Sequence, residues 1–215
     1  MKKSVYSLVL NDDVVALVDR AAAKRGISRS SFINEVLARE LAHVTPEMRI
    51  REIFDSLERI AEGMPFRVKE QPSDAMMSLF GSLSYKYNPT VRYSVELLPK
   101  TAGTIGALKV SFRTQSASFM EALSEFFYFL SGLESAYAPK GVSYTPENGK
   151  IARTLVVPHG AQYSADETGF AISEYIKMFD RALNTYFSYL PDTETAARCT
   201  AGVYTEYLNH TKYLI

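Results

Sequence analysis

Residues 3–10 alternate between two faces and are rich in β-branched and aromatic side chains, a pattern that predicts a short β-strand. One face of this strand carries the larger apolar side chains Tyr6, Leu8 and Leu10. The opposite face carries Val5, Ser7 and Val9, preceded by Lys3. The alternation therefore predicts a strand with one strongly apolar face.

Two amphipathic helices are predicted directly after this strand. Asn11 can cap a helix over residues 12–25, whose first turn is acidic and which stops before Gly26. Ser28 can cap a second helix over about 29–42. Their apolar positions recur at three- and four-residue spacing and are Val14, Val15, Val18, Ala21 and Ala22, then Phe32, Ile33, Val36, Leu37 and Leu41.

A single strand has no partner inside so short a unit, and both helices expose a wide apolar face. A second copy resolves both problems, because two strands can pair antiparallel across a two-fold axis while four helices close over them. A two-stranded ribbon fits the major groove of DNA, where its outer side chains can contact base edges. The first-turn amides at residues 28–30 would offer a phosphate site on each flank.

The string from Tyr6 to Leu37, YSLVLNDDVVALVDRAAAKRGISRSSFINEVL, resembles the ribbon-helix-helix repressors of the MetJ, Arc and CopG type. Their order of strand, helix, Gly-apolar-Ser-(Arg/Lys)-Ser and second helix is matched without a gap, over about the first fifth of the chain. The resemblance implies an obligate dimer that binds operator-like DNA. The residues expected to read bases are Lys3, Val5, Ser7 and Val9, and those expected to bind phosphates are Lys2, Ser28, Arg29 and Ser30.

This sequence departs from the family at the outward strand positions, where family members usually carry polar or basic side chains. Val5 and Val9 can offer only apolar contacts, for example to thymine methyl groups. The alternative interpretation is that the ribbon serves dimerisation alone.

A third helix is predicted over residues 46–62, with Thr45 as cap and Pro46 at its first position. It either connects the dimer unit to the rest of the chain or is an ordinary core helix. The prolines of residues 64–73 mark the expected boundary, which divides the chain into a DNA-binding module (1–45), a connecting helix (46–63) and a further domain (64–215).

Residues 64–215 predict a mixed α+β domain, so that the fold class of the chain is α+β with an amino-terminal ribbon-helix-helix module. Strands are expected over 91–97 and 108–112, as a hairpin closed by residues 99–104, and over about 151–157. Helices are expected from Ser73-Asp74 to Phe80, from Ser118 to Gly132, over about 166–190, and over about 194–210 with Thr193 as cap. Residues 139–149 are expected to form a loop.

Charge and composition narrow the classes of protein. The chain has 215 residues with 24 basic and 24 acidic side chains, which argues against a uniformly cationic, histone-like protein that wraps DNA. Residues 1–45 nevertheless carry seven basic and five acidic side chains. The single cysteine, the short apolar run at the start and the lack of a long apolar segment predict a soluble, cytoplasmic protein without a membrane partner.

Residues suited to catalysis are sparse. His43, His159 and His210 have no metal-ligand spacing, and no phosphate-binding glycine loop or GxSxG elbow is present. His159 lies where a strand-end loop could present it to a ligand, although a capped loop histidine is the more common case. Cys199 is expected to be a small buried residue on a helix. We therefore expect no enzyme activity, no metal and no cofactor.

Six tyrosines lie in the last part of the chain. They could form a stacking platform for single-stranded nucleic acid, but their helical spacing favours core or interface packing. They are Tyr175, Tyr186, Tyr189, Tyr204, Tyr207 and Tyr213.

The sequence as a whole predicts a dimeric, sequence-specific transcriptional regulator, repressor-like, whose second domain binds a ligand or protein partner or builds higher oligomers. Two alternatives remain: an accessory DNA-binding protein of plasmid partition or conjugative transfer, and, less well supported, an antitoxin.

Overall fold

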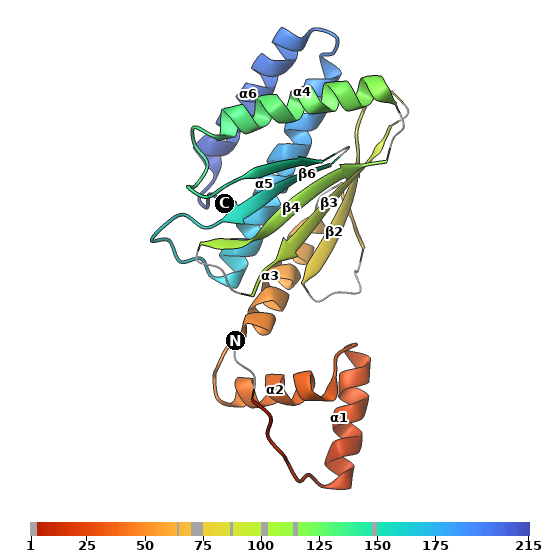
Figure 1. Ribbon diagram of the computed structural model, residues 1–215, viewed down its shortest axis with the longest axis vertical. Helices are drawn as coiled ribbons and strands as arrows, with labels where there is room; N and C mark the ends of the chain where they lie inside the picture. The colour runs from red at the N-terminus through yellow and green to blue at the C-terminus, as the bar shows by residue number, and fades with distance from the viewer. Residues whose placement is uncertain are drawn as a thin grey trace. The chain divides into compact units, whose positions relative to one another are not determined.

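The computed structural model describes residues 4–63, 65–69, 75–86, 88–99, 103–113, 116–147 and 150–215, with the side chains of residues 69 and 147 excepted. The chain divides into two compact units, Met1–Met48 and Arg49–Ile215 (Figure 1). The second unit has an extensive apolar core, whereas the first unit buries few apolar side chains.

The first unit contains helices α1 (Asp12–Lys24) and α2 (Arg29–Glu40), which confirms both predicted helices. α1 ends as predicted, because Gly26 takes a φ of 65° and the amides of Gly26 and Ile27 bond to the carbonyls of Ala23 and Ala22. Asn11 occupies the N-cap position in an extended conformation, but its side chain makes no capping hydrogen bond. Ser28 is the cap of α2, and its hydroxyl accepts from the amide of Ser31 at 3.1 Å.

Residues 4–11 have neither helical nor strand structure in the single chain. The strand predicted over residues 3–10 is therefore not formed there, and residue 3 lies outside the described residues. The physical reason is that a strand is defined by hydrogen bonds to a neighbour, and none of the described residues of this chain pairs with this segment.

The second unit is built on a six-stranded antiparallel sheet with the order β1-β2-β3-β4-β6-β5. The strands are β1 (Arg67–Lys69), β2 (Met76–Ser82), β3 (Thr90–Leu97), β4 (Thr104–Phe112), β5 (Tyr144–Glu147) and β6 (Lys150–Val156). The helices are α3 (Pro46–Ala61), α4 (Ala117–Glu134), α5 (Ala165–Ser188) and α6 (Thr193–His210). The mixed α+β class, the β3–β4 hairpin, β6 and the helices over 46–62, 166–190 and 194–210 are thereby confirmed. Residues 100–102 of the hairpin loop lie outside the described residues.

One face of the sheet forms the core with the helices, and Figure 1 shows α5 behind β4 and β6. The alternation of β3 turns Val91, Tyr93 and Val95 inward, where all three are fully buried. The apolar stripe of α3, from Ile50 to Ala61, belongs to the same core. α3 is therefore a core helix of the second unit.

The helix predicted from Ser73-Asp74 to Phe80 is wrong. Ser73 and Asp74 lie outside the described residues, and Met76–Ser82 form β2, paired along its whole length with β3. The local sequence is ambiguous because methionine and leucine are good helix formers, and pairing with the neighbouring strand decides the outcome.

The boundaries of two helices and one strand also differ from the prediction. β5 lies within the predicted loop, and as an edge strand it tolerates Pro146. α4 is capped by Ser116, not Ser118, and continues through Gly132 to Glu134. α6 is capped by Asp192, whose carboxylate accepts from the amide of Thr195 at 3.1 Å.

Candidate nucleic-acid interface

The segment predicted to form the DNA-reading ribbon is exposed on both of its faces. Val5 and Val9, on the predicted outward face, are fully exposed, and Ser7 is exposed as well. The predicted inward face is exposed too, with Tyr6 at 83% and Leu8 at 58%. In the single chain this segment is thus an apolar surface without a partner among the described residues.

The helices of the first unit leave further large apolar side chains exposed. These are Val14, Leu17, Val36 and Leu37 on the helices and Leu41, the residue that follows α2. Among the described residues of this unit, the buried apolar side chains are those of Ala22 and Ala38. A unit of this size with so small a core does not bury enough apolar surface to be stable by itself.

A charged contact joins the end of α1 to α2, and it was not predicted from the sequence. Glu35 is buried, and its carboxylate lies 3.5 Å from Nη1 of Arg25. The Arg25 guanidinium also lies over the Phe32 ring, 5.3 Å from its centroid. The pairing is not readable from the sequence, because Arg25 and Glu35 lie on different helices and only the turn between them sets their distance.

The amino end of α2 holds three of the residues expected to bind phosphates. The Ser28 hydroxyl is engaged locally, since it caps the helix and lies 2.9 Å from the Ser31 hydroxyl. Arg29 forms an ion pair with Asp19 of α1. The amides of Arg29 and Ser30 belong to the first turn, where helix geometry provides no acceptor, and Ser30 is exposed. The amino end of α2 therefore presents main-chain donors, whereas the Arg29 side chain is engaged by Asp19. Lys2 and Lys3 lie outside the described residues.

His43 belongs to the first unit, and His159 and His210 belong to the second. His159 is exposed at the rim of a cleft of about 1270 Å³ in the second unit, which Arg49 and Lys140 also line. Nδ1 of His210 lies 2.8 Å from the carbonyl oxygen of Glu206, a contact within α6. No group of three or more His, Cys, Asp or Glu side chains that could hold a metal occurs among the described residues. Cys199 is half-buried, more exposed than expected.

A charged network in the core of the second unit was also missed. The Glu134 carboxylate is fully buried and accepts hydrogen bonds from Arg153 and from the hydroxyls of Tyr144 and Tyr175. The Arg153 guanidinium also covers the Tyr175 ring at 4.0 Å and donates to the main-chain oxygen of Ile215 at 2.6 Å. Burial raises the pKa of Tyr175 and Tyr144 well above the ordinary value, so both phenols stay protonated as donors. The network is satisfied internally and serves the fold.

Most of the late tyrosines pack in the core, in agreement with the favoured interpretation. Tyr175, Tyr186 and Tyr204 are buried, and Tyr207 and Tyr213 pack against the core. Tyr189 is 45% exposed. These side chains do not form a surface platform.

The fold and these sites define a small two-helix unit with an unpaired apolar segment, followed in the sequence by an α+β domain. No protein-family model matches the chain, and neither curated proteins nor solved structures show a significant similarity to it. Among the described helices, none combines the length and apolar character that a membrane crossing requires.

Proposed function

We propose that the protein is a dimeric DNA-binding regulator, in which residues 3–10 of two chains pair as an antiparallel ribbon that enters the major groove. The observation that carries this proposal is the exposed apolar face of Tyr6, Leu8 and Leu10 beside two helices that lack a core. Pairing two copies would supply the missing strand hydrogen bonds and cover the exposed apolar side chains together.

Burial of the exposed apolar side chains would stabilise a dimer relative to an isolated unit. Each large apolar side chain that becomes fully buried contributes roughly 1.5–3 kcal/mol. Leu17, Leu37 and Leu41 are more than half exposed in the single chain, so their contribution is available to an interface. Because the alternation leaves Val5, Ser7 and Val9 on the other face, dimerisation would leave them exposed to DNA.

The proposed contacts with DNA divide into two kinds. Lys3, Val5, Ser7 and Val9 would lie on the groove side of the ribbon, where Ser7 can hydrogen-bond a base edge and the valines can contact thymine methyl groups. Lys2, the α2 amino end with Ser28 and Ser30, and Arg29 once released from Asp19, would bind phosphates.

The second unit would then carry the regulatory role, by binding a ligand or protein partner or by joining dimers on neighbouring sites. Joining two DNA-bound dimers raises their apparent affinity because the second binding event is intramolecular.

The experiment is a selection of bound duplexes from a random library with the full chain, followed by titration of the best duplex. Lys3→Ala should weaken binding to all duplexes alike, whereas Ser7→Ala should change the preference between duplexes. Lys177→Ala, on the exposed side of α5, is the matched control and should bind as the unaltered chain does. Failure to enrich any duplex would contradict the proposal. The genes beside the best genomic site would separate a repressor from an accessory protein of partition or transfer.

A further inference from the structure

The sheet of the second unit has a face that does not belong to the core. Along β3, Val91, Tyr93 and Val95 point into the core, so Arg92, Ser94 and Glu96 lie on the opposite face. The side chains of this outer face are exposed or half-buried in the described residues, apart from Ser78, Ser94 and, at the end of β6, Val156. Those two serines are short, and Arg92 lies over them and donates to the Ser78 hydroxyl at 3.2 Å. In Figure 1 this face of β2, β3 and β4 is turned toward the viewer, away from α5.

A continuous row of side chains crosses five strands of this face. The strand register places Arg67, Phe80, Arg92, Ser111 and Lys150 opposite one another in that order. Neighbouring strands lie about 4.8 Å apart, so the row is roughly 19 Å long. In the strand register Phe80 lies between Arg67 and Arg92 of the adjacent strands, and the Arg92 guanidinium is 5.8 Å from the centroid of the Phe80 ring.

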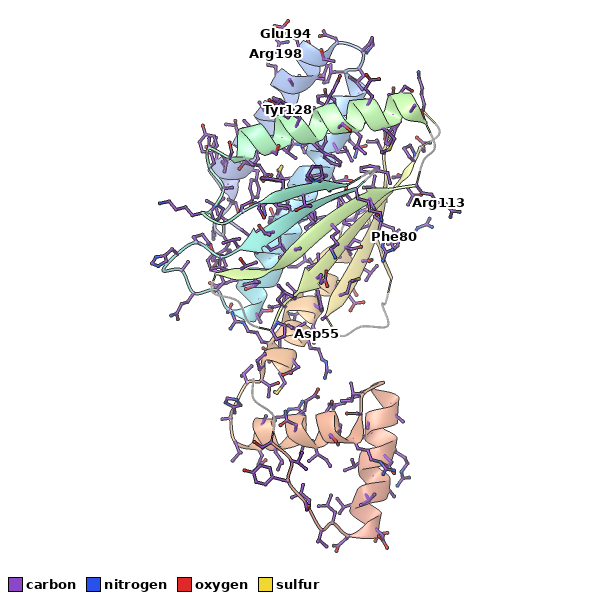
Figure 2. All side chains as sticks on the ribbon, viewed as in Figure 1. Asp55, Phe80, Arg113, Tyr128, Glu194 and Arg198 are labelled. Carbon is purple, nitrogen blue, oxygen red and sulfur yellow. The ribbon has the colours of Figure 1, made fainter. Side chains whose placement is uncertain are left out.

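Charge is segregated onto this face. Its described charged side chains are Arg67, Arg92, Lys109 and Lys150 against Glu96, which pairs with Lys109 at 2.6 Å. The whole of residues 49–215 carries 17 basic and 18 acidic side chains, so the excess of positive charge on the sheet is balanced by acidic groups elsewhere. Arg113 follows β4 and adds an exposed cation at the end of the sheet where Phe80 lies (Figure 2).

We propose that this outer face binds single-stranded nucleic acid, with Phe80 stacking on a base and the cations of the row contacting phosphates. An aromatic ring between cations on an open, cationic sheet supplies both contacts that single strands use. The small side chains of Ser94, Ser111 and Ala152 leave room above the sheet for the chain of the ligand. A broad sheet face does not enter the groove of a duplex as a two-stranded ribbon does, and Phe80 can stack only on an unpaired base.

The surface is separate in sequence from the proposed ribbon, so the two proposals can fail independently. The experiment measures the affinity of the full chain for a labelled oligothymidine and, in parallel, for a labelled duplex. The first variant, Arg67→Gln combined with Lys150→Gln, changes exposed cations at the two ends of the row. The second, Phe80→Leu, removes the ring and keeps an apolar side chain. The matched control combines Lys177→Gln with Arg181→Gln, which removes two exposed cations of α5.

We expect the double sheet variant to lose about tenfold in affinity for oligothymidine at low salt, and its salt dependence to fall by about 1.4 in log–log slope for two lost phosphate contacts. Phe80→Leu should lose roughly fivefold or more. The α5 control should change neither value, and duplex binding should survive both sheet variants.

Three results would overturn the proposal: no binding of oligothymidine by the unaltered chain, equal affinities of the sheet variants and the α5 control, or equally tight binding of polyglutamate that Phe80→Leu leaves unchanged. The last would assign the face to an acidic polypeptide. A variant of residues 3–10 that loses duplex binding but keeps oligothymidine binding would support separate sites for the two ligands.

Discussion

Nε of Arg153 on β6 donates a hydrogen bond of 2.9 Å to the carboxylate of Glu134 at the end of α4, and both side chains are almost completely buried. This pair ties the helical layer to the sheet at a point where water cannot replace either partner. The hydroxyls of Tyr144 and Tyr175 satisfy the rest of the carboxylate. Removal of Arg153 would leave the Glu134 carboxylate buried without a cation.

Arg153→Met should destabilise the second unit by about 3–5 kcal/mol, because it leaves the Glu134 charge buried without its cation. Urea unfolding of the full chain measures the loss. Arg181→Met is the matched control, since Arg181 pairs with Glu206 at the surface and such pairs contribute about 0–1 kcal/mol. Equal losses in the two variants would show that Glu134 is not held as described.

Ala42→Gly should stabilise the first unit by about 1 kcal/mol. Ala42 follows α2 with a φ of 51°, and the amides of Ala42 and His43 close the helix end on Arg39 and Ala38. Gly26 occupies the equivalent position after α1 with a φ of 65°. Glycine adopts this conformation without the strain that a Cβ adds. Gly26→Ala should therefore cost a similar amount, although a Cβ there has open space around it. Thermal unfolding followed by circular dichroism measures both, and shifts of the same sign would contradict the assignment.

The stability of the second unit should depend on the protonation of Asp180. Burial raises the pKa of this carboxyl above its ordinary value, although hydrogen bonds from Tyr93 and Asn184 oppose the shift. A raised pKa means that the folded state holds the proton more tightly, so this contribution is present at low pH and is lost as the pH rises through the folded-state pKa.

Asp180→Asn should therefore gain stability relative to the unaltered chain as the pH is raised from below the ordinary aspartate pKa to neutrality. The asparagine oxygen can still accept from the Tyr93 hydroxyl, whose distance to Asp180 is 2.7 Å. Urea unfolding at a series of pH values measures the difference. A difference that is constant, or that shrinks toward neutral pH, would show that the carboxyl is not destabilised by burial.

Elements with a complete local signal could be predicted from the sequence. α1 has its periodic apolar stripe, acidic first turn and Gly26 stop, and β3 has the uninterrupted alternation from Val91 to Leu97. β2 could not be predicted in this way, because Met76 to Phe80 suit a helix locally and become a strand only through pairing with β3. β5 forms by pairing with β6, and because proline is rare in strands, Pro146 argues against a strand in the local sequence.

The candidate sites also divide into features that are readable from the local sequence and features that depend on how elements pack. The outward alternation of Val5, Ser7 and Val9 is readable from the sequence, whereas the ion pair of Arg29 with Asp19 depends on the angle between α1 and α2. The row of Arg67, Phe80 and Arg92 exists only through the register of three strands, one of which was predicted as a helix. The need for glycine at position 106 likewise follows from the fold, because a Cβ on Gly106 of β4 would clash with the Glu96 carbonyl oxygen of the neighbouring strand.

Sedimentation equilibrium of the full chain tests most directly whether residues 3–10 pair between two copies. Leu8→Asp changes the proposed inner face of the ribbon, and Val5→Asp places the same charge on the outer face of the same segment, where Val5 is fully exposed. We expect twice the mass of one chain for the unaltered protein and for Val5→Asp, and the mass of a single chain for Leu8→Asp. A monomeric unaltered protein, or a Leu8→Asp variant that remains dimeric, would contradict it.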